Sequence, residues 1–249
     1  MKNNILLLLV AAVFAPAVLA QTLTADEIVK RVDENARGKY LYSEIKMTIV
    51  RPTWQREIGI KSWSRGSDYS LAVITSPARE KGQAFLKRKK DLWNWQPSIG
   101  RMIKMSSSIM GQSWMGSDFT NDDLMRESST VNDYTHRLDG QEQVRGFDCW
   151  KITLTPKEEA AVVWGKVVMW VDKKTFVEIK TEFYDEDGTL INTFNSFDIK
   201  QYGSRSLASR MEVVPADKPG QKTVMTVLKY DFDTPIEESF FSQQRMKNS

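Results

Sequence analysis

The sequence predicts a mainly β protein of the α+β class, in which one antiparallel sheet accompanies a few helices. Short runs of alternating apolar and polar residues fill most of the chain, which indicates strands with one covered and one wet face. A single strongly amphipathic helix precedes them, and no linker, repeat or low-complexity tract divides the chain. So many sequential strands must close into a barrel, curl into a half-barrel or stack as a sandwich. A helix between two stretches of strands favours a curled sheet with helices on its concave side, and any part of the apolar interior that they leave unfilled is a cavity.

Residues 1–20 have the pattern of a secretory signal peptide. Lys2 precedes an apolar run from Ile5 to Phe14, and the small-residue cleavage pattern ends at Ala20. The apolar run is too short to span a bilayer. We therefore expect one soluble domain, residues 21–249, in the periplasm of a Gram-negative cell. No cysteine stands at the cleavage site, so the chain is not expected to be a lipoprotein itself.

The first structured element is a helix expected over residues 25–37. Thr24 and Glu27 have the spacing of a capping box, and Gly38 is a natural C-terminal stop. The apolar residues of this segment recur at helical spacing and form one stripe: Ile28, Val29, Val32 and Ala36. A helix with one apolar face must lie against another part of the protein.

Alternating residues predict five strands after this helix. They lie near residues 44–49, 58–63, 71–75, 84–86 and 91–95. The last two form the arms of a hairpin around the basic run 87–90, which we expect to be a solvated loop tip. Attraction to anionic head groups or to an acidic partner is the alternative for this run. The formal net charge of +3 is close to neutral, so no nucleic-acid partner is predicted.

The segment between residues 99 and 119 is too apolar for the loop that its small polar residues indicate. Methionine is flexible and polarisable, so a methionine-rich surface repacks around ligands of many shapes. We therefore interpret this segment as the apolar lip of a binding site, and the alternative is that its methionines cap a core. The candidate ligand-binding residues are Met102, Met105, Ile109, Met110, Trp114, Met115 and Phe119, together with Trp93 and Trp95 in the preceding strand.

A short helix is expected to start at Thr120, with Asp123 at its third position and Leu124 and Met125 turned inward. A hairpin turn is expected at residues 185–188, which end in Asp-Gly. Further strands are expected near residues 144–154, 163–171, 177–184, 190–199, 208–214 and 223–232. The whole chain is therefore expected to hold about ten or eleven strands and two or three helices.

Few residues of the chain are suited to catalysis. His136 is the only histidine and is expected at the surface, while Cys149 is the only cysteine and is expected in the core. No G-x-S-x-G motif is present, and metal sites usually recruit several His or Cys side chains. The sequence therefore predicts a protein that is not an enzyme and has no metal or cofactor.

Two ligand alternatives remain open at this stage. The carboxylates at residues 185–187 suit calcium, although a solvated turn explains them as well. A pair of carboxylates beside Trp93, Trp95 or Trp114 is typical of a sugar-binding or carbohydrate-active protein.

Several motifs resemble the outer-membrane lipoprotein-sorting protein family of the LolA type, and more closely its longer branch. The resemblance spans the chain after the signal peptide and is most specific between Ser106 and Phe119. The matching motifs are Gly82-x-Ala84-Phe85-Leu86, Asp91-Leu92-Trp93, Pro97-Ser98-Ile99-Gly100-Arg101, Ser106-Ser107-Ser108, Met115-Gly116-Ser117-Asp118-Phe119-Thr120-x-x-Asp123-Leu124, Gly146-Phe147-Asp148-Cys149-Trp150-Lys151 and Phe240-Phe241-Ser242.

This resemblance implies an incomplete antiparallel β-barrel curled over a few helices, as in LolA and LolB, with an apolar concavity. It implies a periplasmic carrier that binds lipids or the acyl chains of lipoproteins and moves them between membranes or to and from a transporter. It also implies a monomer whose partner is an inner-membrane transporter of the resistance-nodulation type. Arg101 lies in a motif of this branch, and with Lys104 it is a candidate for gating or polar contact. The alternative role is a non-catalytic sensor or accessory module that binds a membrane-protein partner.

Overall fold

The part of the chain that the structure describes holds thirteen antiparallel strands and three short or medium α-helices. The computed structural model describes residues 23–125 and 129–249, so the signal peptide expected at residues 1–20 lies outside the described residues. The strands are β1 (Tyr40–Arg51), β2 (Trp54–Arg65), β3 (Tyr69–Ser76), β4 (Ala84–Arg88), β5 (Asp91–Gln96), β6 (Arg101–Met105), β7 (Tyr134–Val144), β8 (Phe147–Pro156), β9 (Lys166–Asp172), β10 (Glu178–Tyr184), β11 (Leu190–Tyr202), β12 (Arg205–Pro215) and β13 (Lys222–Asp231). The helices are α1 (Ala25–Arg37), α2 (Asn121–Met125) and α3 (Gln243–Lys247), with 3-10 turns η1 (Pro97–Ile99), η2 (Ser107–Ile109) and η3 (Glu238–Phe240).

All thirteen strands belong to one open sheet in the order β6-β5-β4-β3-β2-β1-β13-β12-β11-β10-β9-β8-β7. The chain therefore enters at the centre of the sheet with β1 and proceeds strand by strand to the edge at β6. It then crosses to the opposite edge at β7 and returns to the centre, where β13 pairs with β1. The connection from β6 to β7 must span the sheet, and this topology is what places residues 106–125 over its interior.

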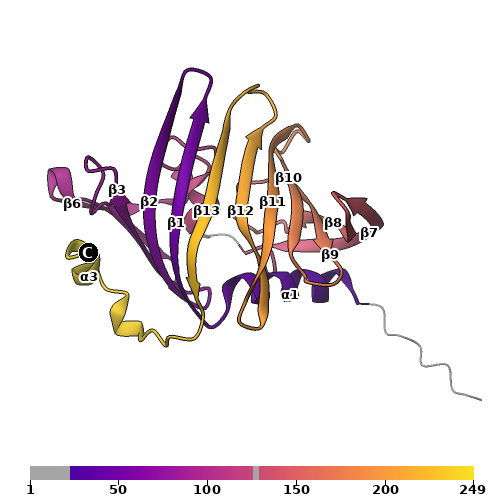
Figure 1. The fold of residues 1–249 in the computed structure, drawn as a ribbon, viewed down its shortest axis with the longest axis horizontal. Coiled ribbons are helices and arrows are strands. Elements are labelled where there is room, and N and C mark those ends of the chain that lie inside the picture. The colour runs from indigo at the N-terminus through magenta and orange to yellow at the C-terminus, as the bar shows by residue number, and fades with distance from the viewer. Residues whose placement is uncertain (1–22, 126–128) are drawn as a thin grey trace, which may run out of the picture.

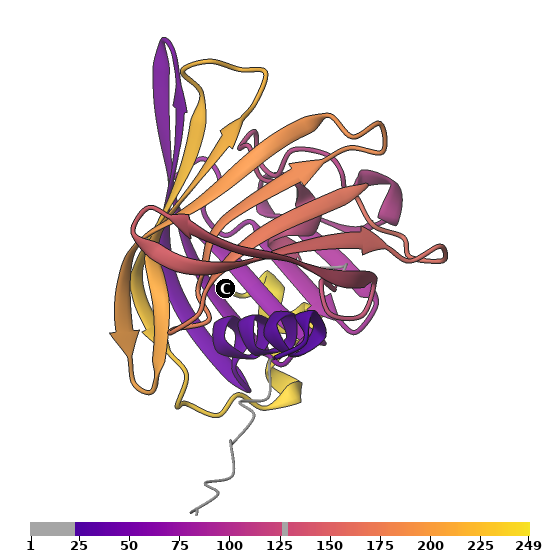
Figure 2. The same ribbon diagram turned by 90° about the vertical axis from the view of Figure 1, so that its right-hand side faces the viewer.

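The sheet curls strongly, so that it has a concave and a convex side. Figure 1 shows α1 running beneath β12 to β9, on one half of the sheet, and Figure 2 shows the sheet curling around this helix. The mainly β fold with an incomplete barrel over a few helices is therefore confirmed. In the described part of the chain, no helix is both long enough and apolar enough to cross a membrane.

Helix α1 has the boundaries that the sequence predicts. The Thr24 side chain accepts a hydrogen bond from the Glu27 backbone N–H, and the Glu27 carboxylate accepts one from the Thr24 N–H at 2.8 Å. These bonds satisfy two of the free N–H groups at the helix start. The stripe formed by Ile28, Val29 and Val32 is buried against β8 and β9, which explains why the helix lies on this half of the sheet.

Each side of the sheet carries a separate apolar core. On the concave side, one cluster joins β1 to β5 with residues 110–125, and a second joins α1 to β7, β8 and β9. On the convex side, residues 236–246 cover β3, β4 and β5, burying Phe241 and Met246. Strand β9 is buried on both faces, because Val167 and Met169 join the cluster with α1 while Val168 and Trp170 join a further cluster with β8 and β10, which explains why it is apolar at nearly every position.

Two strands were not predicted, and the expected count of ten or eleven was too low. Residues 101–105, expected as part of an apolar lip, form β6, and residues 134–144 form β7. These are the two edges of the sheet. His136 was expected at the surface, and this was also wrong. Only 2% of its side chain is exposed, and its ring bonds from β7 to Asp26 of α1.

Candidate functional site

Residues 106–125, which we call the covering segment, form a compact unit on the concave side of the sheet. The backbone N–H of Trp114 donates to Phe119 O at 2.8 Å, and that of Asp122 donates to Met110 O at 3.0 Å. A short β-bridge between Ser113 and Thr120 closes the turn. These internal bonds satisfy the polar backbone, so the segment can present its apolar side chains to the sheet.

The apolar side chains of the covering segment are part of the core. Met110, Trp114 and Phe119 are each at most 3% exposed and pack against the concave face of β1 to β5. The Trp114 ring lies 5.2 Å from the ring of Phe85, centroid to centroid, and the ring of Phe119 lies 5.2 Å from that of Phe194. The concave interior is therefore filled by the protein's own side chains.

The residues predicted to bind ligand lie on opposite sides of the sheet. Met105, Ile109, Met110, Trp114, Met115 and Phe119 contact the concave core. Trp93, Trp95 and Met102 instead contact the convex core beneath the C-terminal residues 236–246. The register explains the division, because Met102 opposes Trp95 while Met105 opposes Leu92, and alternate residues of a strand point to opposite faces.

The two predicted gating residues are exposed on edge strand β6. Arg101 opposes Gln96 in the sheet register, and the Lys104 ammonium forms an ion pair with Asp91 at 2.7 Å. Lys104 has the same strand parity as Met102 and therefore lies on the convex side, away from the covering segment.

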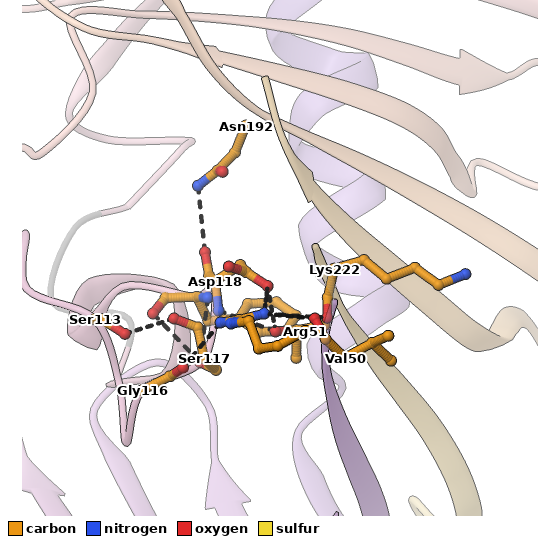
Figure 3. A network of polar contacts seen from close by, with 10 residues as sticks. Val50, Arg51, Ser113, Gly116, Ser117, Asp118, Asn192 and Lys222 are labelled. Carbon is orange, nitrogen blue, oxygen red and sulfur yellow. Dashed lines mark hydrogen bonds and ion pairs between the residues drawn. The ribbon is translucent and has the colours of Figure 1, made fainter. Parts of the chain in front are cut away.

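A buried ion pair holds the covering segment to the sheet. Figure 3 shows Arg51 at the end of β1 reaching the segment, where its Nη1 lies 2.9 Å from Asp118 Oδ2 and its Nη2 donates to Gly116 O at 3.0 Å. The same Asp118 oxygen accepts from Thr223 Oγ1 of β13 at 2.6 Å, and Asn192 of β11 donates to Asp118 O at 3.2 Å. Side chains of β1, β11 and β13 therefore all bond to Asp118. We call these contacts of Arg51, Asn192 and Thr223 with Asp118 the clamp.

Little in the sequence indicates this clamp. Asp118 is the first carboxylate after the uncharged residues 105–117. Its position is the one sign in the sequence that this carboxylate has a cationic partner. Nothing in the sequence pairs it with Arg51 or Thr223, because they lie 67 and 105 residues away along the chain.

A second carboxylate, that of the half-buried Asp123, fixes the start of α2. Its Oδ2 accepts from the Thr120 N–H at 2.7 Å, so the helix start expected at Thr120 is confirmed. Its Oδ1 accepts from the Trp164 indole at 3.3 Å. Burial raises the pKa of Asp123 to about 6, and the hydrogen bonds from Thr120 and Trp164 offset only part of this effect.

One polar atom of the interior lacks a hydrogen-bond partner. The indole N–H of Trp114 is buried and has no acceptor among the described residues. A buried unpaired donor is uncommon, since it forfeits the hydrogen bond that water gives it in the unfolded chain. The N–H therefore lies in the apolar interior as a donor that an incoming acceptor can use.

The residues considered for catalysis are engaged in structure. Cys149 is fully buried, and burial raises the pKa of its thiol to about 11, which disfavours the reactive thiolate. His136 bonds to Asp26 and to Thr130 O. Within residues 23–125 and 129–249, no group of three or more His, Cys, Asp or Glu side chains is arranged to hold a metal ion.

The chain was compared with family models and with curated proteins. A family model described as "Uncharacterized protein" matches residues 66–248, which is more than half of the chain. A comparison with curated proteins found no match.

Solved structures resemble the chain over almost its whole length. A DUF1329 family protein from Desulfovibrio piger is 24% identical with a TM-score of 0.82, covering 89% of this chain and 97% of its own. A putative outer membrane lipoprotein-sorting protein domain from Vibrio parahaemolyticus is 24% identical with a TM-score of 0.79, covering 90% and 98%. A LolA superfamily protein from Nitrosomonas europaea is 24% identical with a TM-score of 0.77, covering 90% and 100%. The chain therefore belongs to the family whose model matches residues 66–248, and its fold is that of the LolA-type outer-membrane lipoprotein-sorting proteins.

Proposed function

We propose that the protein is a periplasmic carrier that binds lipids or the acyl chains of lipoproteins in the concave interior of its sheet. The observation that carries this proposal is the covering segment, a separate unit that fills an otherwise open apolar concavity. Beneath it lie fully buried side chains of β1, β2 and β3, among them Met47, Ile58 and Ile74. Movement of the segment exposes this surface to a ligand.

Acyl chains suit such a surface physically. Burial of each methylene contributes roughly 0.8 kcal/mol, so a chain can replace the contacts that Met110, Trp114 and Phe119 make in the closed state. Because the segment and the ligand compete for the same surface, net binding is moderate and the ligand can be released. The flexible side chains of Met105 and Met115 adapt to either occupant.

The clamp around Asp118 is the proposed control point of this exchange. Arg51 and Thr223 hold the segment closed, and both are fixed on strands at the centre of the sheet. When the clamp opens, the indole N–H of Trp114 becomes available to an ester or amide oxygen of the ligand. Trp93, Trp95 and Met102 take no part in this site, because they lie on the convex side.

The periplasmic location, the monomeric state and the resistance-nodulation-type transporter remain parts of the proposal. They are supported by the signal-peptide pattern of residues 1–20 and by the motifs shared with the longer LolA-like branch. The proposed activity involves binding and release only, with no bond made or broken.

A filled interior favours one second candidate, an accessory module that recognises a membrane-protein partner without carrying lipid. Native mass spectrometry of the mature protein purified from periplasm, followed by extraction of bound molecules, separates the two. A co-purifying lipid or acylated peptide supports the carrier. A mass of protein alone, unchanged after incubation with lipids and acylated peptides, contradicts it and favours the accessory module.

Two methionines of β6 provide a matched test of where the ligand lies. Met105→Gln introduces a polar group on the concave side, whereas Met102→Gln makes the same change on the convex side. We expect Met105→Gln to weaken acyl-chain binding by about tenfold, since burying a methionine side chain contributes about 1.5–3 kcal/mol, and Met102→Gln to leave it unchanged. Equal effects of the two variants would place the ligand elsewhere.

A further inference from the structure

A polar hollow of about 480 Å³ lies at the C-terminal end of α1, outside the concave interior. It is bounded by α1, by the turn between β9 and β10, and by the hairpin between β11 and β12. These elements are fixed to one another, because the Asn35 side-chain amide donates to Ser206 O at 2.9 Å and contacts Thr175 O at 3.4 Å. The hollow is therefore a preformed feature of the fold.

Positive charge predominates in this hollow. Arg31, Lys174 and Arg205 line it, against one acidic residue, Glu34. Glu34 already has a cationic neighbour in Lys30, at 3.9 Å. Neither Arg31 nor Lys174 forms an ion pair with any described residue. Arg31 and Lys174 thus line the same space as Arg205 without an ion pair, although hydrogen bonds from Thr24 and, less strongly, the nearby charge of Arg31 lower the pKa of the Glu27 carboxylate.

Arg205 is held in place at the floor of the hollow. Its Nη1 donates to the α1 carbonyls of Glu34 at 2.6 Å and Asn35 at 2.9 Å, and its guanidinium lies over the ring of Phe232. These bonds offset the negative end of the α1 dipole, which otherwise disfavours an anion here. The other N–H groups of Arg205 have no acceptor in the described part of the chain, so they remain available to a ligand.

Phe176 forms an apolar wall of the same hollow in an unusual backbone conformation. Its φ of 56° is rare for a bulky residue, and such strain persists only where the surrounding structure imposes it. The ring packs at 5.4 Å from that of Trp150, and the Arg31 guanidinium stacks over it at 5.2 Å. This cation–π contact holds the guanidinium at the ring face and uses none of its N–H groups as hydrogen-bond donors.

We propose that this hollow binds the phosphate group of a phosphate-bearing ligand, with Arg31, Lys174 and Arg205 as its cationic contacts. A phosphate presents several oxygens to donors from different directions, whereas a carboxylate presents two. Three cations that line one hollow from three separate elements therefore match a phosphate better. Ser204 also lines the hollow and can supply a neutral donor, and Phe176 can contact the carbon skeleton attached to the phosphate.

The phosphate can come from a soluble phosphate ester or from the head group of an anionic phospholipid. The proposal is independent of the acyl-chain site, because the hollow and the covering segment share no residue. Calorimetric titration with glycerol 3-phosphate tests the first source. Co-sedimentation with phosphatidylcholine vesicles, with and without phosphatidylglycerol, tests the second.

The decisive variant is Arg31→Gln/Lys174→Gln, at two exposed positions of the hollow. Its matched control is Lys90→Gln/Lys173→Gln, which removes the same charge outside the hollow, at one distant residue and one adjacent residue. We expect the first pair to weaken binding by at least about tenfold, since both cations would lose their charge-assisted hydrogen bonds to the phosphate, and the control to bind like the wild type.

Binding of glycerol 3-phosphate with this variant pattern supports a site for soluble phosphate esters. The same pattern seen only with phosphatidylglycerol vesicles supports a site for a lipid head group. Absence of binding to both probes overturns the proposal. Equal weakening by the two variant pairs also overturns it, because the attraction is then a property of net charge rather than of the hollow.

Discussion

At the scale of single residues, ionisation of Asp123 opposes folding. The group titrates near its ordinary pKa of 3.8 in the unfolded chain, while burial raises the pKa to about 6 in the native protein. Between these values the native state holds a proton that the unfolded state has lost. The free energy of unfolding should therefore fall as the pH rises from about 4 to about 7, by up to about 3 kcal/mol from this group at 1.36 kcal/mol per pKa unit.

The variant Asp123→Asn removes this dependence, because an amide stays neutral at every pH. It also loses one hydrogen bond, since one oxygen cannot accept from both Thr120 N–H and the Trp164 indole. We expect urea unfolding between pH 4 and 7 to show a smaller slope of stability with pH than in wild type. Asp91→Asn, at an exposed carboxylate, should keep the wild-type slope, and an unchanged slope in Asp123→Asn would contradict the assignment.

The Arg51–Asp118 pair should be strongly coupled because both side chains are nearly buried, at 12% and 5% exposure. Arg51→Met leaves the Asp118 carboxylate without its cation, which should lower the free energy of unfolding by about 3–5 kcal/mol. The double variant Arg51→Met/Asp118→Asn should lose less than the sum of the single losses. Urea unfolding of the four proteins in this cycle measures the coupling.

The exposed pair Lys46–Glu57 is the control for this cycle. It joins β1 to β2 at 3.2 Å, but its side chains are 45% and 52% exposed. Its coupling should not exceed about 1 kcal/mol, because solvent screens the charges. A coupling at Arg51–Asp118 as small as this would show that the clamp contributes little to holding the covering segment.

At the scale of secondary-structure elements, α1 depends on its capping box. Thr24→Ala removes the acceptor for the Glu27 N–H, and loss of an N-cap costs about 1 kcal/mol. Glu27→Gln is the conservative control, because the glutamine oxygen can still accept from the Thr24 N–H. We expect thermal unfolding to show a clear loss for Thr24→Ala and a smaller one for Glu27→Gln, and the reverse order would contradict this account.

Elements whose signals are local could be predicted from the sequence, and those defined by the sheet could not. The bounds of α1 followed from its cap, its apolar stripe and Gly38, all within the helix or beside it. Strands β6 and β7 were missed because edge strands are mostly exposed and lack the alternation of covered strands. The hairpin turn at residues 185–188 was recognised because Asp-Gly acts through backbone conformation alone, with Gly188 at φ 81°.

The candidate site was predicted in composition but not in geometry. Its apolar residues drew attention because they occur where polar residues are expected, and most of them do contact the concave core. Whether a residue of a strand faces the concave or the convex side depends on the register of that strand. For Met102 and Met105 this register became known only from the pairing of β6 with β5. The clamp joins residues more than sixty positions apart, so no sequence window contains it.

At the scale of the whole molecule, the chain path explains why the interior is covered. The sheet starts at its centre, and the chain must then cross from the β6 edge to the β7 edge. The covering segment is part of this crossing, whereas α1 packs in a separate cluster with β8 and β9. The fold thus separates a scaffold of paired strands from a unit that few backbone hydrogen bonds join to it.

This separation predicts a distinct order of amide hydrogen exchange. Amides of β1 pair within the centre of the sheet, whereas those of Trp114 and Asp122 bond only within the covering segment. Local opening requires less free energy than global unfolding, so the segment amides should exchange before those of β1. Arg51→Met should accelerate exchange in the segment more than in α1 and β8, because neither contacts the clamp and both speed up only through the loss of global stability. Acceleration that is uniform over the molecule would instead mean that the segment opens only when the whole sheet unfolds, and the interior could then not be loaded by a local movement.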